Sequence, residues 1–186
     1  MQNNEPNVLY EVKLKGLVLE VDHGGKFDAT HLLANGRANY ILFESFIAQC
    51  AGLSPNSQGG ASDLCDENGQ GYEVKSYRDP MSFPGLRHDK FHTGASSTFG
   101  PNNHGPTIKR LLRAGDYSEA FKICKELGFN KNDFYIYVNS AQYDINIPLR
   151  YIILTTTDVL ALLSKDDPRV ISRSEILARA KKTVRL

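Results

Sequence analysis

The chain has 186 residues, of which 41% are hydrophobic and 23% are charged, and its formal net charge is +1. This length and composition are typical of one soluble globular domain, so a single domain over residues 1–186 is predicted. The balanced charge excludes a strongly basic nucleic-acid-binding chain but not a local basic patch. No apolar run approaches the length of a membrane-spanning helix, and no membrane partner is expected.

The three cysteines, Cys50, Cys65 and Cys124, are odd in number and widely spaced. They form no CxxC or Cys/His metal pattern, so free thiols in a reducing compartment are expected. The first eight residues lack the basic-then-apolar order of a secretory signal. These features predict a cytoplasmic protein.

The first 35 residues are expected to form an N-terminal hairpin or arm. Residues 8–21 alternate in polarity around a break at Lys15-Gly16, which favours two paired strands, and the following DHGGKFD indicates a turn. Such a hairpin could serve as a dimer arm, or it could cover the edge of the core sheet.

Residues 36–165 are expected to form the core, which begins with a helix over 39–53 that ends at Gly52. The elements expected next are two strands around DENGQG in 61–77, helices at 106–114 and 117–127, buried strands in DFYIYVNS and RYIILTTT, and a short helix at 158–164. Residues 166–186 are assigned to a C-terminal helix, with Ser172 as N-cap and Glu175 in the capping-box position. This order predicts a mixed α/β fold, a central mixed sheet flanked by helices.

The tetrapeptide Tyr-Glu-Val-Lys occurs twice, at 10–13 and at 72–75. An acid and a lysine two residues apart share one face of a strand. Chance alone gives about 1.4 acid-x-Lys tripeptides in a chain of this composition, so the motif needs support from its context. A metal-assisted phosphodiesterase requires at least two carboxylates on Mg²⁺ and a cation near the attacking water.

The second tetrapeptide has a further carboxylate in reach, Asp63, which lies ten residues before Glu73. A three-residue loop over 67–69, with its glycine in the left-handed position, places Asp63 directly opposite Glu73. The two side chains would be roughly 5 Å apart at Cβ, with Lys75 next along the same face. Carboxylates so close repel each other unless a divalent cation lies between them. A two-residue turn would instead place Asp63 opposite Val74, on the wrong face.

The first tetrapeptide lacks such a partner, because Glu5 is the only acid before Glu11. Glu11 is therefore expected on a solvent-facing hairpin edge. A further candidate, Glu44, lies in the helix expected over 39–53, on a stripe with Ile41 and Ile47. A carboxylate on an apolar stripe either has a partner or a cation, or lies partly exposed at the helix rim.

The stretch SDLCDENGQGYEVKS, from Ser62 to Ser76, resembles the core of type II restriction endonucleases of the PD-(D/E)xK superfamily, and especially their PvuII-like group. The spacing from aspartate to Glu-x-Lys and the turn between them are similar. The proline that often precedes the aspartate is replaced by Ser62. The resemblance in the motif covers roughly residues 60–77, and the order of elements extends it loosely over 38–160.

The resemblance implies a Mg²⁺-dependent endonuclease, with Mn²⁺ as a substitute, that cuts a short sequence of double-stranded DNA in a prokaryotic cytoplasm. It implies that Asp63, Glu73 and the carbonyl of Val74 bind the metal, that Lys75 acts on the attacking water, and that Glu44 supports them. A homodimer on a palindromic site and a protecting DNA methyltransferase are the implied partners. A repair nickase or junction resolvase of the same superfamily, and a non-catalytic DNA-binding module, remain as alternatives.

Residues 78–105 form a polar stretch that is too long for an idle connector. In the PvuII-like group, histidines after the catalytic lysine read bases, so this stretch is expected to contact DNA. The candidate DNA-binding residues are Arg87, His88, Lys90, His92, Asn102, Asn103 and His104. A solvated mobile loop is one alternative. A zinc site is another, although the histidines lack the usual ligand spacing.

Two further groups of basic residues could contact phosphates. Lys109, Arg110 and Arg113 follow the polar stretch on an expected helix, where a charged solvent-facing surface explains them equally well. Lys181, Lys182 and Arg185 are expected at the C-terminal end of the last helix, which favours cations in any case.

Overall fold

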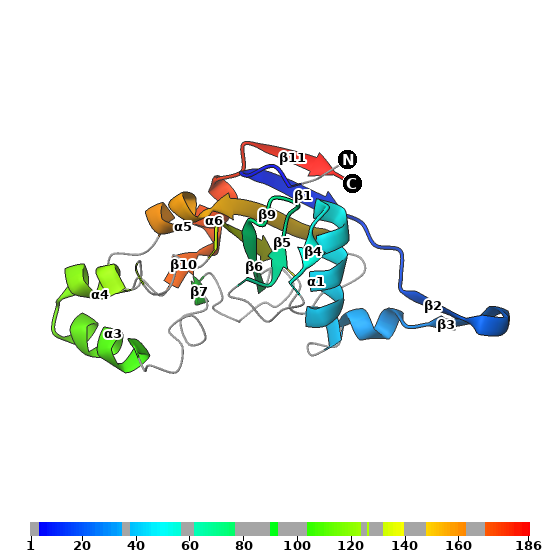
Figure 1. Ribbon diagram of the computed structural model, residues 1–186, viewed down its shortest axis with the longest axis horizontal. Helices are drawn as coiled ribbons and strands as arrows, with labels where there is room; N and C mark the ends of the chain where they lie inside the picture. Colours follow the sequence, from blue (N-terminus) through cyan, green and yellow to red (C-terminus); the bar gives the residue numbers. More distant parts are fainter. Residues whose placement is uncertain are drawn as a thin grey trace.

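The computed structural model describes residues 4–34, 38–56, 62–76, 90–92, 104–123, 126, 132–139, 148–162 and 170–186. Its centre is a seven-stranded mixed sheet with the strand order β11-β1-β9-β8-β6-β5-β4 (Figure 1). The strands of this sheet are β1 (Val8–Val12), β4 (Ser54–Pro55), β5 (Leu64–Cys65), β6 (Gly71–Ser76), β8 (Phe134–Val138), β9 (Leu149–Thr155) and β11 (Lys182–Arg185). The expected mixed α/β class is confirmed.

The remaining elements are two small sheets and several short helices. β2 (Val18–Val21) pairs with β3 (Gly25–Asp28), and β7 (Lys90–His92) pairs with β10 (Val170–Ser172). The helices are η1 (Asp22–Gly24), η2 (Thr30–Ala34), α1 (Ala38–Ala51), α3 (His104–Arg113), α4 (Tyr117–Ile123), α5 (Thr156–Leu162) and α6 (Arg173–Ala178). Helix α1 is followed by Gly52 at φ +70°, the left-handed conformation that the sequence predicts for this stop.

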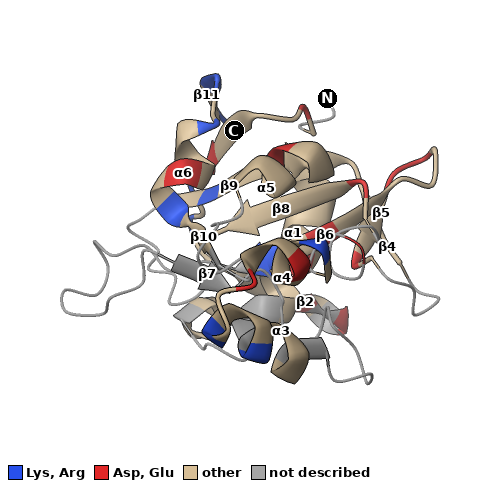
Figure 2. Cartoon of the chain, turned by 90° about the vertical axis from the view of Figure 1, so that its left-hand side faces the viewer, with Lys and Arg blue, Asp and Glu red and all other residues tan. Residues whose placement is uncertain are grey.

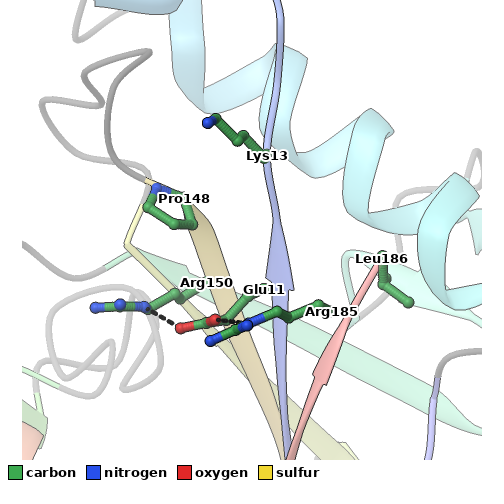
Figure 3. A pocket seen from close by; sticks show the side chains of 6 residues that line it. All are labelled: Glu11, Lys13, Pro148, Arg150, Arg185 and Leu186. Atoms are coloured by element: carbon green, nitrogen blue, oxygen red, sulfur yellow. Dashed lines mark hydrogen bonds and ion pairs between the residues drawn. The ribbon is translucent and has the colours of Figure 1, made fainter.

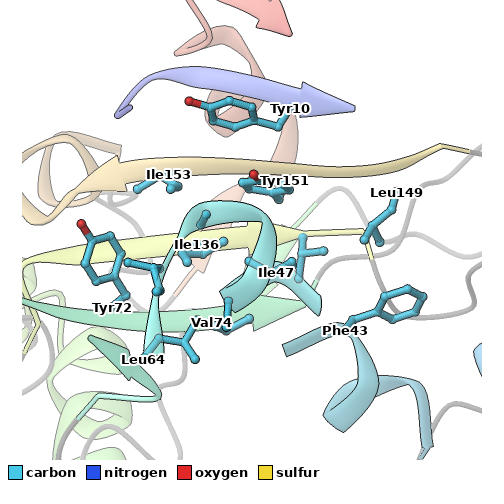
Figure 4. Close-up of a cluster of buried hydrophobic side chains, with 14 of the residues drawn as sticks. Tyr10, Phe43, Ile47, Leu64, Tyr72, Val74, Ile136, Leu149, Tyr151 and Ile153 are labelled. Carbon is cyan, nitrogen blue, oxygen red and sulfur yellow. The ribbon is translucent and has the colours of Figure 1, made fainter. Parts of the chain in front are cut away.

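One face of the large sheet packs against α1. Val74, Ile136 and Tyr151 project from three strands toward Phe43 and Ile47 of the helix (Figure 4), and all five side chains are buried. The opposite face carries a second cluster, in which strand residues such as Tyr135, Tyr137, Ile152 and Leu154 pack with residues of α5 and α6. Burial on both faces explains the continuous apolar runs of β8 and β9.

The hairpin that joins β5 to β6 has the register predicted from its sequence. Leu64 is paired with Tyr72, and the backbone N–H of Asp66 donates to the carbonyl of Gln70 over 3.2 Å. The loop therefore has three residues, and Gly69 has φ +79°. A glycine suits this position because a side chain is strained in the left-handed region.

The N-terminal strands do not form the hairpin expected over 8–21. β1 lies inside the large sheet, between β11 and β9, whereas β2 pairs with β3 alone. The β2–β3 ribbon extends away from the body of the molecule (Figure 1), and its Leu19 and Phe27 are exposed. The alternation in 8–21 predicted two strands, but their partners come from distant parts of the chain, which local periodicity does not encode.

The prediction of a C-terminal helix over 166–186 is also wrong in part. Ser172 takes the N-cap position of α6, but its side chain makes no capping hydrogen bond and its Oγ lies 2.7 Å from that of Ser174. The helix ends at Ala178, and Lys182 and Arg185 lie on β11, the edge strand parallel to β1. Within the described residues, no helix is both long and apolar enough to cross a membrane.

Candidate active site

The candidate site lies at the edge of β6 where the pairing with β5 ends. Continuing the hairpin register by one residue brings Asp63 opposite Glu73. The backbone N–H of Asp63 donates to the carbonyl of Tyr72 over 3.0 Å, and its carboxylate accepts the N–H of Val74 over 2.8 Å. The N–H and C=O of one strand residue point to the same neighbour, so the carbonyl of Val74 also points to the edge that Asp63 occupies.

Glu73 and Lys75 lie on the face of β6 opposite to Val74. The ammonium group of Lys75 donates to Oε1 of Glu73, and the two side chains are only 15% and 17% exposed. Nδ2 of Asn132 donates to the other oxygen, Oε2, over 3.4 Å. Both carboxylate oxygens of Glu73 are therefore held, one by a cation and one by an amide.

The pKa of Glu73 is raised above its ordinary value. Burial is the largest cause, and the charge of Asp63 raises the pKa further. The hydrogen bonds from Lys75 and Asn132, together with the charge of Lys75, lower it but do not compensate fully. A buried carboxylate beside a second carboxylate is a group whose ionised form a divalent cation would stabilise.

Glu44 of α1 belongs to the same electrostatic group. Its side chain is half-buried, and its pKa is raised by burial first and then by the charges of Asp63 and Glu73, while Lys75 lowers it. Ile41, which was expected to lie on the same apolar stripe as Glu44, is 69% exposed. Glu44 therefore lies at the border of the apolar face of α1. The charges of three carboxylates and one lysine, which lie on α1 and the β5–β6 hairpin, thus shift the pKa values within this group.

Three residues around Glu73 were not anticipated from the sequence. Asn132 precedes β8 and is 9% exposed, and Tyr135 and Tyr137 face Glu73 and Lys75 across the parallel β6–β8 ladder. Burial is the main cause that raises the pKa of Tyr135 to about 12, with the charge of Glu73 adding to it. The parallel pairing that brings these residues to Glu73 joins strands about sixty residues apart, so no short-range signal reveals it.

The donor atoms present fit a hard cation such as Mg²⁺. Asp63 and Glu73 offer carboxylate oxygens, Val74 offers a backbone carbonyl on the Asp63 side, and these are the ligand types that Mg²⁺ prefers. In the part of the chain that the structure describes, no three side chains among His, Cys, Asp and Glu come close enough to hold a metal ion. A metal at this edge would thus depend on two carboxylates, the carbonyl and water.

The first Tyr-Glu-Val-Lys tetrapeptide has a different setting from the one predicted. Glu11 lies on an interior strand rather than on a solvent-facing hairpin edge, and its side chain is 15% exposed. Its carboxylate accepts Nε of Arg150 over 2.8 Å and Nε of Arg185 over 3.4 Å. Two arginines on the neighbouring strands therefore balance the negative charge of Glu11. Glu73 has a single lysine, Lys75, whose charge also acts on Glu44.

Most of the predicted DNA-contacting segment lies outside the described residues, including Arg87, His88, Asn102 and Asn103. Lys90 and His92 lie on β7, which pairs with β10, and His104 begins α3. Arg110 and Arg113 in the last turn of α3 are exposed, and Figure 2 shows basic residues on this helix. α3 is thus a basic helix directly after the polar stretch.

Comparison with protein-family models, curated proteins and solved structures found no match for this chain. The assignment of a function therefore rests on the geometry around Asp63, Glu73 and Lys75.

Proposed function

We propose that the chain is a Mg²⁺-dependent endonuclease that cleaves double-stranded DNA at a short specific sequence. The observation that carries the proposal is the convergence of Asp63, Glu73 and Lys75 at the edge of β6 where its pairing with β5 ends, with the carboxylate of Asp63 on the N–H of Val74. An acid opposite Glu-x-Lys supplies the two carboxylates and the cation that metal-assisted phosphodiester hydrolysis requires.

The residues have distinct roles in this proposal. Asp63, Glu73 and the carbonyl of Val74 would hold the metal ion, which when bound polarises the scissile phosphate and lowers the pKa of a bound water. Lys75 would orient that water and stabilise the negative charge that develops on the phosphate. Because Lys75 hydrogen-bonds to Glu73, its ammonium group is already positioned at the site. Glu44 would bind a second cation or order the water network.

The fold is compatible with a restriction-endonuclease-like core. The antiparallel β5–β6 hairpin carries the motif, β6 continues into a parallel pair with β8, and α1 with Glu44 packs on one face. A palindromic target would require a twofold homodimer with one site per strand. The residues of 78–105 and the basic end of α3 would contact the DNA, and a DNA methyltransferase would protect the host sequence.

The decisive experiment is incubation of the purified protein with a long duplex DNA, in Mg²⁺ and in EDTA. Discrete fragments that require Mg²⁺ or Mn²⁺ would support a site-specific endonuclease, and mapping their ends would give the target. A Mg²⁺-dependent smear would favour the repair branch of the superfamily. Binding without cleavage under every metal condition would favour a DNA-binding module and overturn the nuclease proposal.

A matched pair of variants separates the motif from the surrounding hairpin. Glu73→Gln removes the charge of the predicted metal ligand, and Glu67→Ala removes an exposed carboxylate from the loop of the same hairpin. Cleavage should be lost in the first variant and retained in the second. Equal rates in the two variants would show that Glu73 does not take part in catalysis.

A further inference from the structure

Apart from the candidate active site, basic residues gather at the end of the large sheet where β1 and β11 finish and β9 begins. A pocket of about 340 Å³ is lined there by Glu11, Lys13, Pro148, Arg150, Arg185 and Leu186 (Figure 3). Three cationic side chains from separate segments thus line the pocket, and two of them, Arg150 and Arg185, contact the carboxylate of Glu11. The three cations outnumber the one acidic side chain of the lining, and an excess of positive charge favours an anion.

The guanidinium groups are held in place by the carboxylate between them. Arg150 and Arg185 both donate through Nε to Glu11, and the dashed lines in Figure 3 mark these contacts. Arg185 is 88% exposed, so it can present its other N–H groups to a ligand. Lys13 is also exposed. A guanidinium oriented in this way is suited to a phosphate, whose several oxygens accept paired N–H donors.

The pocket lies on the same face of the sheet as the candidate active site. Lys75 is in register with Tyr137, and Tyr137 is in register with Ile152 of β9. Arg150 is two residues from Ile152 on the same strand, so its side chain points to the face that carries Lys75. Glu11, which is in register with Arg150, points to that face as well.

The spacing between the two sites matches the DNA backbone. β9 is two strands from β6, which is about 10 Å, and Arg150 is two residues further along the sheet than Lys75, which adds about 7 Å at right angles. The two positions are thus about 12 Å apart at Cα. One strand of B-DNA rises about 3.4 Å per nucleotide and also winds around the axis, so neighbouring phosphates are roughly 6 to 7 Å apart and this separation corresponds to roughly two nucleotides.

We propose that the pocket around Lys13, Arg150 and Arg185 binds a backbone phosphate of the DNA whose scissile bond lies at Lys75. This inference rests on the proposed nuclease function and deepens it, since it adds a second phosphate contact to the same DNA strand. The first Tyr-Glu-Val-Lys tetrapeptide then contributes to substrate binding through Lys13, and Glu11 positions the two arginines.

The test is DNA binding by a Lys13→Ala/Arg185→Ala double variant. These side chains are exposed, so their removal should leave the fold intact, which a thermal melt would verify. Fluorescence anisotropy with a labelled duplex, in Ca²⁺ to prevent cleavage, gives the slope of log K against log[NaCl]. The slope should become shallower by about 1, because the pocket is proposed to contact one phosphate and each such contact contributes about 0.9.

Two control variants distinguish a phosphate contact in the pocket from a general effect of surface charge on DNA binding. Lys26→Ala removes an exposed lysine from the β2–β3 ribbon and should leave the salt slope unchanged. Lys13→Arg/Arg185→Lys keeps both charges and should retain most of the wild-type slope. If the double alanine variant keeps the wild-type slope while the wild type binds and cuts DNA, the pocket inference is overturned and the nuclease proposal survives.

A separate experiment tests whether the ligand of the pocket is DNA or a free phosphate compound. Inorganic pyrophosphate is titrated against the melting temperature of the wild type and of the double alanine variant. A rise that the variant loses, combined with unchanged DNA binding by that variant, would assign the pocket to a free phosphate ligand and overturn the DNA assignment. If the wild type neither binds nor cuts DNA, both proposals fail together.

Discussion

The carboxylate of Asp63 accepts the backbone N–H of Val74 over 2.8 Å, at the point where β5 no longer pairs with β6. The side chain thus takes the place of a strand partner, and it fixes Asp63 beside the carbonyl of Val74. One hydrogen bond therefore connects the stability of the hairpin edge with the chemistry of the candidate site.

Substitutions at Asp63 should separate these two roles. Asp63→Asn keeps an oxygen that can accept the N–H of Val74, so the free energy of unfolding should change by no more than about 0.5 kcal/mol. Asp63→Ala leaves this N–H without its partner and should cost about 1 to 2 kcal/mol. Both variants should lose Mg²⁺-dependent cleavage. Denaturant melts and cleavage assays on the same preparations would check this, and an active Asp63→Asn would mean that the charge is not needed.

Replacement of Lys75 should change both the rate and its pH dependence. Lys75→Met removes the cation expected to act on the water and the phosphate, so cleavage should fall by about 10² to 10³. The hydrogen bond and charge of Lys75 lower the pKa of Glu73, so their loss raises it. Ionised Glu73 is needed to hold the metal, and the acidic limb of the pH–rate profile should move to higher pH. A limb that stays in place would show that Glu73 does not control it.

Asn132 is predicted to position Glu73 rather than to contact the substrate. Its amide donates to Oε2 of Glu73, and this hydrogen bond lowers the pKa of the carboxyl group. Asn132→Ala should therefore move the acidic limb of the pH–rate profile upward, and Asn132→Asp should move it further because a like charge is added. The rate on the plateau should change less than in Lys75→Met. An unchanged limb in both variants would contradict a positioning role.

The hairpin of the candidate site could be predicted from sequence because its determinants are local. The Glu67-Asn68-Gly69 loop selects a three-residue turn, and the turn sets the register that brings Asp63 to Glu73. The helix stop at Gly52 and the buried strands β8 and β9 were likewise evident, since a left-handed glycine and a continuous apolar run each have one main structural meaning.

The remainder depends on contacts between distant segments. β1 pairs with β11 from the other end of the chain. Glu11 therefore accepts hydrogen bonds from Arg150 and Arg185 instead of facing solvent. Asn132 reaches Glu73 through the parallel pairing of β6 with β8, a contact across 59 residues. Periodicity within one segment predicts which residues form a strand, but the order of strands in the sheet is set by how their apolar faces pack.

Glu44 should show opposite effects on stability and activity. Because burial and the neighbouring carboxylates raise its pKa, the ionised side chain destabilises the metal-free fold at pH values above that raised pKa. Below the ordinary pKa the carboxyl is neutral in both the folded and the unfolded chain, and the effect disappears. Glu44→Gln should thus raise the melting temperature at neutral pH but not at strongly acidic pH, while cleavage decreases. Glu175→Gln, at an exposed glutamate of α6, is the control and should change neither.

Mg²⁺ should stabilise the folded chain if Asp63 and Glu73 bind it, and this can be measured without any DNA. A ligand that binds only the folded state at one hundred times its dissociation constant adds about 2.7 kcal/mol. For a chain of this size each kcal/mol raises the melting temperature by about 2 to 4 °C, so the total rise should be roughly 5 to 10 °C. Relief of the repulsion between Asp63 and Glu73 is the physical source of the gain, so Asp63→Asn should lose most of it. If wild type and Asp63→Asn respond equally to Mg²⁺, the ion binds elsewhere, and the metal site at the edge of β6 would have to be abandoned.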